Sequence, residues 1–312
     1  MILVTGATGV TGALVARRLA THRVPVRLMA RDPRRIDADI PRTETVTADY
    51  ADPLSLRRAL RGVHAAFLVT NHPTAPHDAH FLRAATVEGV GHVVKLSAAA
   101  VDDDIDDFLT RRQREIEELV RGAALSWTVL RPRAFMSNTL AWAAGLRAEG
   151  TVDALYGDAP NTPVDPRDVA SVAVRALTRP EHRGKTYTLV GPEALTARQQ
   201  TGILGALLGT PVIFRERTRQ EEAAVLARRH PPHVVGALLQ RADLQAAGKK
   251  RRTGDDLEQL TGHRPRSYHD WASDHLHHFG GDRDSGSKPD RASERPTTAH
   301  PPAPNSGAAH LN

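Results

Sequence analysis

Short apolar runs alternate with amphipathic stretches along the first half of the chain. Ile2-Leu3-Val4 is long enough for a buried strand, and apolar residues at helical spacing follow it. Because successive strand–helix–strand crossovers give a parallel sheet covered by helices on both faces, this repeated pattern predicts an α/β fold with a doubly wound parallel sheet. The six predicted strands cover residues 2–4, 24–30, 44–48, 65–70, 91–97 and 126–131.

The pattern loosens beyond about residue 150. An amphipathic helix over 165–177 and a strand over 185–190 precede mostly helical segments that reach about residue 279. We expect this second part to form a small C-terminal substrate lobe, so that residues 1–279 are one folded unit. From residue 280 the apolar periodicity disappears and Gly, Ser, Pro, Asp and Arg dominate, which predicts a disordered tail over 280–312.

Three glycines, three residues apart, lie between the first predicted strand and the first predicted helix. Such a turn directs free backbone N–H groups and the positive end of the helix toward one point, which suits a pyrophosphate. In this setting the glycines indicate a Rossmann-type dinucleotide site. The predicted phosphate-binding residues are Gly6, Ala7, Thr8, Gly9, Val10, Thr11 and Gly12.

Arg31 follows the second predicted strand, where a dinucleotide fold meets the adenosine ribose. An acid at this position binds a free 2′-hydroxyl, whereas an arginine suits a 2′-phosphate, so we expect NADP(H) rather than NAD(H). A solvated arginine at a helix start is the alternative. Asp49 lies at the end of the third strand, where it is placed to accept a hydrogen bond from the adenine amino group; a turn or capping role is equally compatible.

The remaining strand ends bring further polar residues to the same edge of the sheet, where ligands of doubly wound folds bind. Thr70 and Asn71 follow the fourth strand, Ser97 ends the fifth, and residues 132–138 follow the sixth. A metal site at His77 and His80 was weighed against surface histidines. Since no further ligands occur at a matching spacing, no metal is expected.

Composition narrows the possible functions. The absence of cysteine excludes disulfides, zinc–thiolate sites and cysteine nucleophiles. The net charge of +6 arises mostly from scattered arginines, with one basic run at 249–252, and only 4% of residues are aromatic, so a solvated surface is favoured over nucleic-acid binding. Met1 leads directly into the first strand and no stretch approaches a membrane helix, so we expect a soluble, cytoplasmic protein.

Taken together, these motifs resemble the NmrA-like group of atypical short-chain dehydrogenases, which includes NADPH:quinone oxidoreductases and cofactor-sensing regulators. The resemblance covers about residues 1–279 and implies an extended Rossmann fold that binds NADP(H). It also implies that the glycine turn and Arg31 hold the phosphates, that Thr70, Asn71 and Ser97 line the path toward the nicotinamide, and that Phe135, Met136 and Asn138 border the nicotinamide or substrate pocket. The residues that carry the resemblance are Gly6–Gly12, Arg31, Ala48–Tyr50, Leu130–Asn138 and Asp165–Asp168.

The chain departs from this group's carbonyl-reducing relatives, which use a Tyr-x-x-x-Lys pair to transfer a proton. None of its tyrosines, at positions 50, 156, 187 and 268, is followed by lysine four residues later, and the corresponding helix carries Leu109 and Gln113. Two functions remain compatible. The favoured one is an NADPH-dependent oxidoreductase that transfers hydride to a quinone or similar small acceptor without this relay. The alternative is a non-catalytic NADP(H) sensor that acts through a protein partner; a homo-oligomer is compatible with either.

Overall fold

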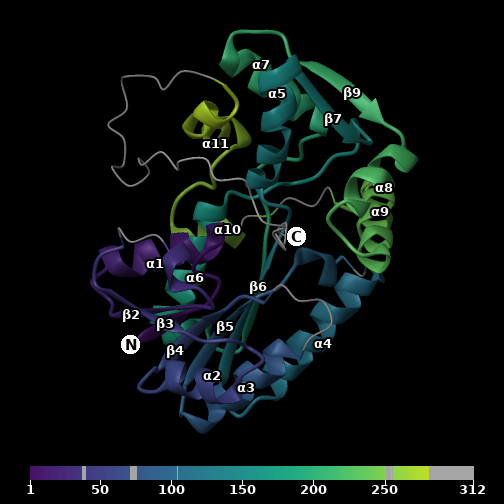
Figure 1. The fold of residues 1–312 in the computed structure, drawn as a ribbon. Helices are drawn as coiled ribbons and strands as arrows, with labels where there is room; N and C mark the ends of the chain where they lie inside the picture. Colours follow the sequence, from purple (N-terminus) through teal and green to yellow (C-terminus); the bar gives the residue numbers. More distant parts are fainter. Residues whose placement is uncertain (37–39, 71–75, 104, 251–253, 255, 281–312) are drawn as a thin grey trace.

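A seven-stranded parallel sheet forms the main body of the protein. The computed structural model describes residues 1–36, 40–70, 76–103, 105–250, 254 and 256–280 (Figure 1). The strand order β3-β2-β1-β4-β5-β6-β8 reverses direction between β1 and β4, which creates the switch point at which such sheets bind ligands. The predicted Rossmann-type α/β fold is therefore confirmed. The strands are β1 (Ile2–Val4), β2 (Val26–Ala30), β3 (Thr43–Thr47), β4 (Ala65–Leu68), β5 (His92–Leu96), β6 (Ser126–Pro132) and β8 (Lys185–Leu189).

Helices cover both faces of this sheet (Figure 1). Alternation along β1 shows the reason, since Ile2 and Val4 pack into the core on one face and Leu3 packs into the core on the other. With both faces buried, the central strands β1 and β4 are continuously apolar, whereas the edge strands β3 and β8 are largely polar. The first face carries α1 (Val10–Thr21) and α6 (Pro166–Thr178), and the second carries α2 (Pro53–Leu60), α3 (His77–Val87) and α4 (Phe108–Gly122).

Aspartates fix the starts of three of these helices. The carboxylates of Asp52, Asp107 and Asp165 each accept a hydrogen bond from a backbone N–H in the first turn of the helix that follows. This arrangement satisfies donors that have no partner within the helix. An aspartate before a proline, as in Asp52-Pro53, is typical of a helix start, and Asp52 does cap α2; Asp107, the last residue of the acidic stretch 102–107, caps α4.

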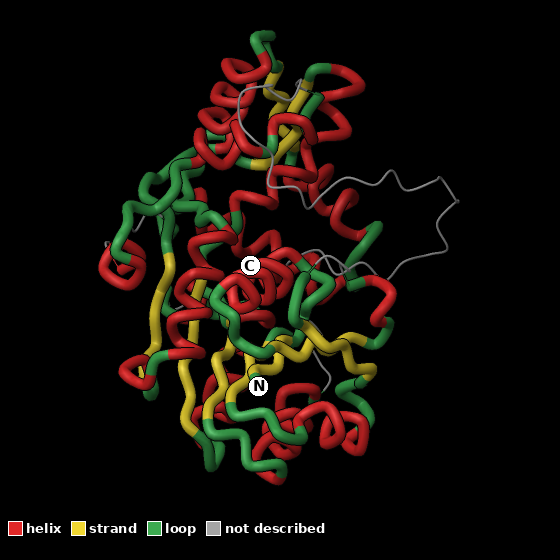
Figure 2. The backbone as a smooth tube through the Cα atoms, turned by 90° about the vertical axis from the view of Figure 1, so that its left-hand side faces the viewer, coloured by secondary structure: helices red, strands yellow, loops and turns green. Residues whose placement is uncertain are grey.

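The chain beyond residue 150 divides between the sheet and a separate lobe. β8 pairs with β6, and α6 packs against α1, so both belong to the main body. The lobe holds a two-stranded parallel sheet of β7 and β9, which Figure 2 shows at the top, away from the main sheet. No helix among the described residues combines the length and apolar character needed to cross a membrane. The remaining elements are α5 (Ala143–Glu149), β7 (Thr151–Leu155), α7 (Ala197–Leu208), β9 (Ile213–Arg217), α8 (Arg219–Ala227), α9 (Pro232–Ala246), α10 (Asp256–Thr261) and α11 (Tyr268–Asp274).

The sequence pattern missed three of the remaining elements and displaced two others. None of α5, β7 and α10 was expected, because none shows a clear period in the sequence. The residues at 211–214 favour a short strand, which the structure places at Ile213–Arg217, and the last helix ends at Asp274 rather than residue 279, with a 3-10 turn after it. Apart from Gly280, the tail predicted to be disordered lies outside the described residues.

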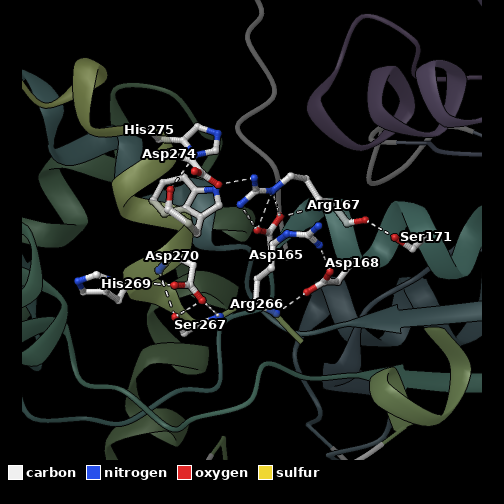
Figure 3. Close-up of polar contacts among 11 residues, drawn as sticks. Asp165, Arg167, Asp168, Ser171, Arg266, Ser267, His269, Asp270, Asp274 and His275 are labelled. Carbon is white, nitrogen blue, oxygen red and sulfur yellow. Dashed lines mark hydrogen bonds and ion pairs between the residues drawn. The ribbon is translucent and has the colours of Figure 1, made fainter. Parts of the chain in front are cut away.

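Ion pairs at the start of α6 fasten the last helix of the lobe to the main body (Figure 3). Arg167 binds Asp165 through Nε, 2.9 Å from Oδ2, and Asp274 through a terminal nitrogen at 2.5 Å. Arg266 donates its backbone N–H to Asp168 Oδ2 at 2.9 Å, and its guanidinium contacts the same carboxylate. The motif over Asp165–Asp168 therefore caps α6 and holds α11 in place.

Candidate active site

The glycine turn between β1 and α1 packs backbone against backbone. Gly6 adopts a left-handed φ of +64°, and the N–H of Gly9 donates to the Gly6 carbonyl at 2.9 Å. A Cβ at Gly12 would lie 2.2 Å from that carbonyl oxygen, so the helix can approach the turn only because residue 12 has no side chain. The turn and the start of α1 are therefore in direct backbone contact.

Neither the N-cap residue nor the first turn of α1 supplies a side chain that would compete with an anion at this helix end. The N-cap is Gly9, which has no side chain to accept these hydrogen bonds, and the first turn contains no acid. Thr8 is exposed at the tip of the turn, whereas Ala7 is buried beneath it. The first turn of a helix has backbone donors without partners in the helix and a partial positive charge, so this end is ready for an anion.

Arg31 is exposed at the end of β2, whereas its neighbour Asp32 forms an ion pair with Arg34. Arg31 is exposed, and no carboxylate in the described part of the chain lies within ion-pair distance of it. Asp32 accepts hydrogen bonds from Arg34, at 2.8 Å from Nε and 3.2 Å from the backbone N–H, which lower the pKa of Asp32. The acid that would suit a free ribose hydroxyl is therefore held by Arg34. At the end of β3, Asp49 accepts a hydrogen bond from the N–H of Ala51 at 2.8 Å, which closes a turn.

A buried ion pair lies at the carboxyl ends of β4 and β5. Lys95 Nζ is 3.2 Å from Asp78 Oδ1 and donates to the hydroxyl of Thr70 at 2.9 Å, and both charged side chains are almost fully buried. Thr70 in turn donates to Asp78, so the predicted cofactor-lining residue belongs to this cluster. The predicted residue Asn71 lies outside the described residues. The sequence analysis missed Lys95 and Asp78; a lysine inside an apolar strand is the signal that could have indicated a buried partner.

Ser97 belongs to a second buried polar cluster. Its hydroxyl donates to Glu117 Oε1 at 2.6 Å, and Arg131 binds the same carboxylate through two nitrogens, at 2.9 and 2.6 Å. Burial opposes the charge of Glu117, but the hydrogen bonds from Arg131 and Ser97 outweigh it, so the pKa of Glu117 lies below its ordinary value. The Ser97 hydroxyl proton is thus directed to α4, not to the open edge of the sheet.

The helix that would carry a Tyr/Lys pair has different chemistry. Leu109 is buried against Val234 and Ala237 of α9, so the lobe covers this position with apolar side chains. One turn further along, the side-chain oxygen of Gln113 is buried and has no hydrogen-bond partner among the described residues. Neither residue can donate a proton to a developing oxyanion at neutral pH in the way a tuned tyrosine does.

All four tyrosine hydroxyls have partners within the structure, and the pKa of each is raised. For Tyr50, Tyr187 and Tyr268 burial is the main cause of the higher pKa, and for Tyr156 it is the hydrogen bond to an aspartate. A raised pKa keeps the hydroxyl protonated and makes it a poor proton relay. The pairs are Tyr50 with the carbonyl of Val69, Tyr156 with Asp243, Tyr187 with His182, and Tyr268 with Thr139.

The segment after β6 contributes mainly to the cores. Phe135 packs into the core beneath α1 and α6, and Met136 packs into the core of the lobe. Of the three residues expected at the substrate pocket, only Asn138 is exposed. Their proximity to a ligand stays a prediction.

The histidines weighed as metal ligands have other contacts. His77 stacks on Tyr50 with ring centroids 5.1 Å apart, and His80 Nδ1 lies 2.9 Å from the Tyr50 carbonyl oxygen. Over the described ranges, no group of three potential ligands could hold a metal ion.

Comparison with known proteins supports the same type of site. Residues 6–180 match the model of a family described as NAD(P)H-binding. The chain is 50% identical over 280 residues to a (4-alkanoyl-5-oxo-2,5-dihydrofuran-3-yl)methyl phosphate reductase of Streptomyces griseus, covering 89% of this chain and 99% of the relative. It is 30% identical over 286 residues to an NAD(P)H azoreductase of Xenophilus azovorans, covering 90% and 99%. The NADPH complex of the Escherichia coli quinone oxidoreductase QOR2 superimposes with a TM-score of 0.77 at 26% identity, covering 89% and 100%.

Proposed function

The chain belongs to the NAD(P)H-binding family, and on that premise we propose that it is an NADPH-dependent reductase of a small, electron-poor alkene. The observation that carries the proposal is that every tyrosine hydroxyl is bound elsewhere, with its pKa raised. A substrate of this enzyme must then accept hydride without a proton from a tyrosine. The non-catalytic sensor is the weaker hypothesis, because relatives at 50% and 30% identity are named as reductases.

The compound named for the Streptomyces relative meets this requirement. Its ring carries a carbon–carbon double bond conjugated to both a lactone carbonyl and an alkanoyl carbonyl. Hydride addition at the ring carbon remote from these carbonyls leaves an enolate whose charge both oxygens share. Water can protonate that anion at the carbon between them, so no strong acid is needed in the site. A quinone, the second candidate, has the same property, and the E. coli neighbour is named for quinones.

The residues at the carboxyl edge fit a dinucleotide phosphate. Gly12 lets the start of α1 lie against the turn, where a Cβ would clash with the Gly6 carbonyl oxygen, and the start of α1 has neither a capping side chain nor an acid. Gly6–Gly12 would hold the pyrophosphate, and Arg31 the 2′-phosphate that distinguishes NADP(H) from NAD(H). When bound, the cofactor supplies the hydride. The protein supplies orientation and excludes water, through residues that include Leu109 and its apolar contacts with α9.

Turnover tests the proposed reaction directly. Purified protein is mixed with NADPH and either the alkanoyl-dihydrofuranone methyl phosphate or a panel of quinones, and loss of absorbance by the reduced nicotinamide is followed. We expect rapid oxidation of NADPH with the furanone, slower oxidation with quinones, and none with simple ketones, which need the missing proton relay. Tight NADP binding without turnover on any acceptor would instead support the sensor.

Cofactor preference is expected to depend on Arg31. The Arg31→Ala variant loses charge-assisted hydrogen bonds worth about 1.5–3 kcal/mol, so the Kd for NADPH should rise about 10- to 100-fold while the Kd for NADH changes little. Fluorescence titration with both cofactors measures the two constants. Arg61→Ala is the matched control, because Arg61 is also an exposed arginine but follows α2 at the opposite edge of the sheet. An equal loss of affinity for both cofactors would contradict the assignment.

A further inference from the structure

A third group of charges lies where β6 meets the lobe, and we propose that Arg133 and Lys250 in it bind the phosphate of the acceptor. Arg133 directly follows β6, and Lys250 follows α9. The inference rests on the proposed function and identifies the part of the substrate that these residues recognise: a phosphate monoester. Residues 251–253 are not part of the proposed site.

Arg133 is buried but not fully used. It is 3% exposed, and its two terminal nitrogens bind Asp103, with NH2 2.9 Å from Oδ1. Its Nε is buried and has no hydrogen-bond partner among the described residues. A buried donor without an acceptor is unfavourable and rare in native structures, which points to a partner supplied by a ligand.

The charges around Arg133 do not balance. Asp103 is paired with Arg133, and Asp107 is paired with Arg241, whose Nε lies 2.8 Å from Asp107 Oδ2. Lys250 adds a third positive charge, and no carboxylate in the described part of the chain lies within ion-pair distance of it. Among the residues that the structure describes here, two carboxylates therefore face three cations, which leaves one positive charge for an anionic ligand.

Burial and the neighbouring positive charges both affect the pKa of Lys250. Burial, followed by the neighbouring charges of Arg241 and Arg133, lowers the pKa of Lys250 to about 8. Repulsion among these cations costs free energy in the empty site, and a bound dianion would remove that cost. The two arginines are held by their own aspartates, so the cations are oriented before the ligand arrives.

The group lies far from the expected cofactor phosphates. β2, which leads to Arg31, and β6, which leads to Arg133, are separated by β1, β4 and β5 in the sheet. With strands about 4.8 Å apart, the two strand ends are ~19 Å from each other. The cofactor would extend from Arg31 across the switch point between β1 and β4. Arg133 lies beyond that point, on the side of the sheet where the acceptor would bind. The contact of α4 with α9 places the lobe over this side.

Binding of inorganic phosphate tests the site without relying on turnover. The enzyme is first saturated with NADP⁺, so that the cofactor's own phosphate sites are occupied, and the apparent Kd for phosphate is obtained from the rise in unfolding temperature. We expect Lys250→Met to weaken phosphate binding about 10- to 100-fold and Lys250→Arg to restore most of it. Lys250 has no ion-pair partner among the described residues, so its removal leaves none of their carboxylates unpaired.

Lys249→Met is the matched control, because Lys249 is the adjacent, exposed lysine. Equal phosphate affinity in the wild type, Lys249→Met and Lys250→Met would overturn the proposal and leave the group a structural contact between α4 and the lobe. An equal loss of phosphate affinity in both lysine variants would also overturn the proposal, because such a loss would indicate only a general effect of surface charge.

Kinetics separates this proposal from the proposed reaction. The phosphorylated furanone is compared with the corresponding alcohol, and the preference for the phosphate, as a ratio of kcat/KM values, should fall about 10- to 100-fold in Lys250→Met. If neither compound is reduced but phosphate binding still depends on Lys250, the reaction is wrong and the binding site stands. If both compounds are reduced and the ratio is the same in wild type and variant, the reaction stands and the site is wrong.

Discussion

Replacing Gly12 with alanine is expected to abolish cofactor binding while leaving the chain folded. The added Cβ would lie 2.2 Å from the Gly6 carbonyl oxygen, and the clash is with backbone, which cannot rotate away as a side chain would. Relief requires the start of α1 to move from the turn, which removes the alignment of N–H groups that a pyrophosphate needs. We expect the Kd for NADPH to rise more than about 100-fold, because the displaced turn would lose two charge-assisted hydrogen bonds to the pyrophosphate.

The measurement is a fluorescence titration of the variant with NADPH, accompanied by circular dichroism to verify folding. Gly202→Ala is the matched control: Gly202 also lies inside a helix, α7, but a Cβ there meets no atom within 4 Å. This control should bind NADPH as the wild type does and gain up to about 1 kcal/mol of helix stability. Normal NADPH affinity in Gly12→Ala would exclude the turn as the phosphate site.

Glu117→Gln is expected to cause the largest loss of stability. Glu117 is fully buried and its carboxylate accepts hydrogen bonds from Arg131, Arg121 and Ser97. Removing one partner of a buried ion pair typically costs about 3–5 kcal/mol, and here it leaves Arg131 with only its longer contact to Asp102, at 3.5 Å. Urea denaturation measures this as a fall in the free energy of unfolding. Glu118→Gln, at the exposed neighbouring position, should change it by less than about 0.5 kcal/mol.

The effect of Glu117 on stability should also depend on pH. Its folded-state pKa lies below the value of about 4.3 expected in the unfolded chain. The stabilisation is therefore fully present above that unfolded value and is lost as the pH falls through the lower, folded pKa. The difference in unfolding free energy between wild type and Glu117→Gln should shrink across this acidic range. A difference that is constant with pH would show that the charge of Glu117 is not its source.

Local patterns were sufficient to predict most of the main domain. The apolar strand Ile2–Val4, the glycines after it and the Asp52 cap each act over a few residues, through side-chain period, backbone freedom or a single hydrogen bond. The spacing from Gly12 to Arg31 also follows from the length of one helix and one strand. For these reasons the sequence by itself determined the α/β class, the parallel sheet and the NAD(P)H-binding family.

Only the tertiary structure decided which polar groups lie together. The pairing of Lys95 with Asp78, and of Ser97 with Glu117, joins strands to helices whose relative position depends on the whole sheet. Arg133 follows a strand of the main sheet and Lys250 follows α9 of the lobe, so their charges act on each other only when α9 packs on α4. Such contacts have no period in the sequence, because each depends on where a distant element is packed and not on neighbouring residues. The sequence therefore indicated an NAD(P)H-binding protein, and the fold brought the buried charges together.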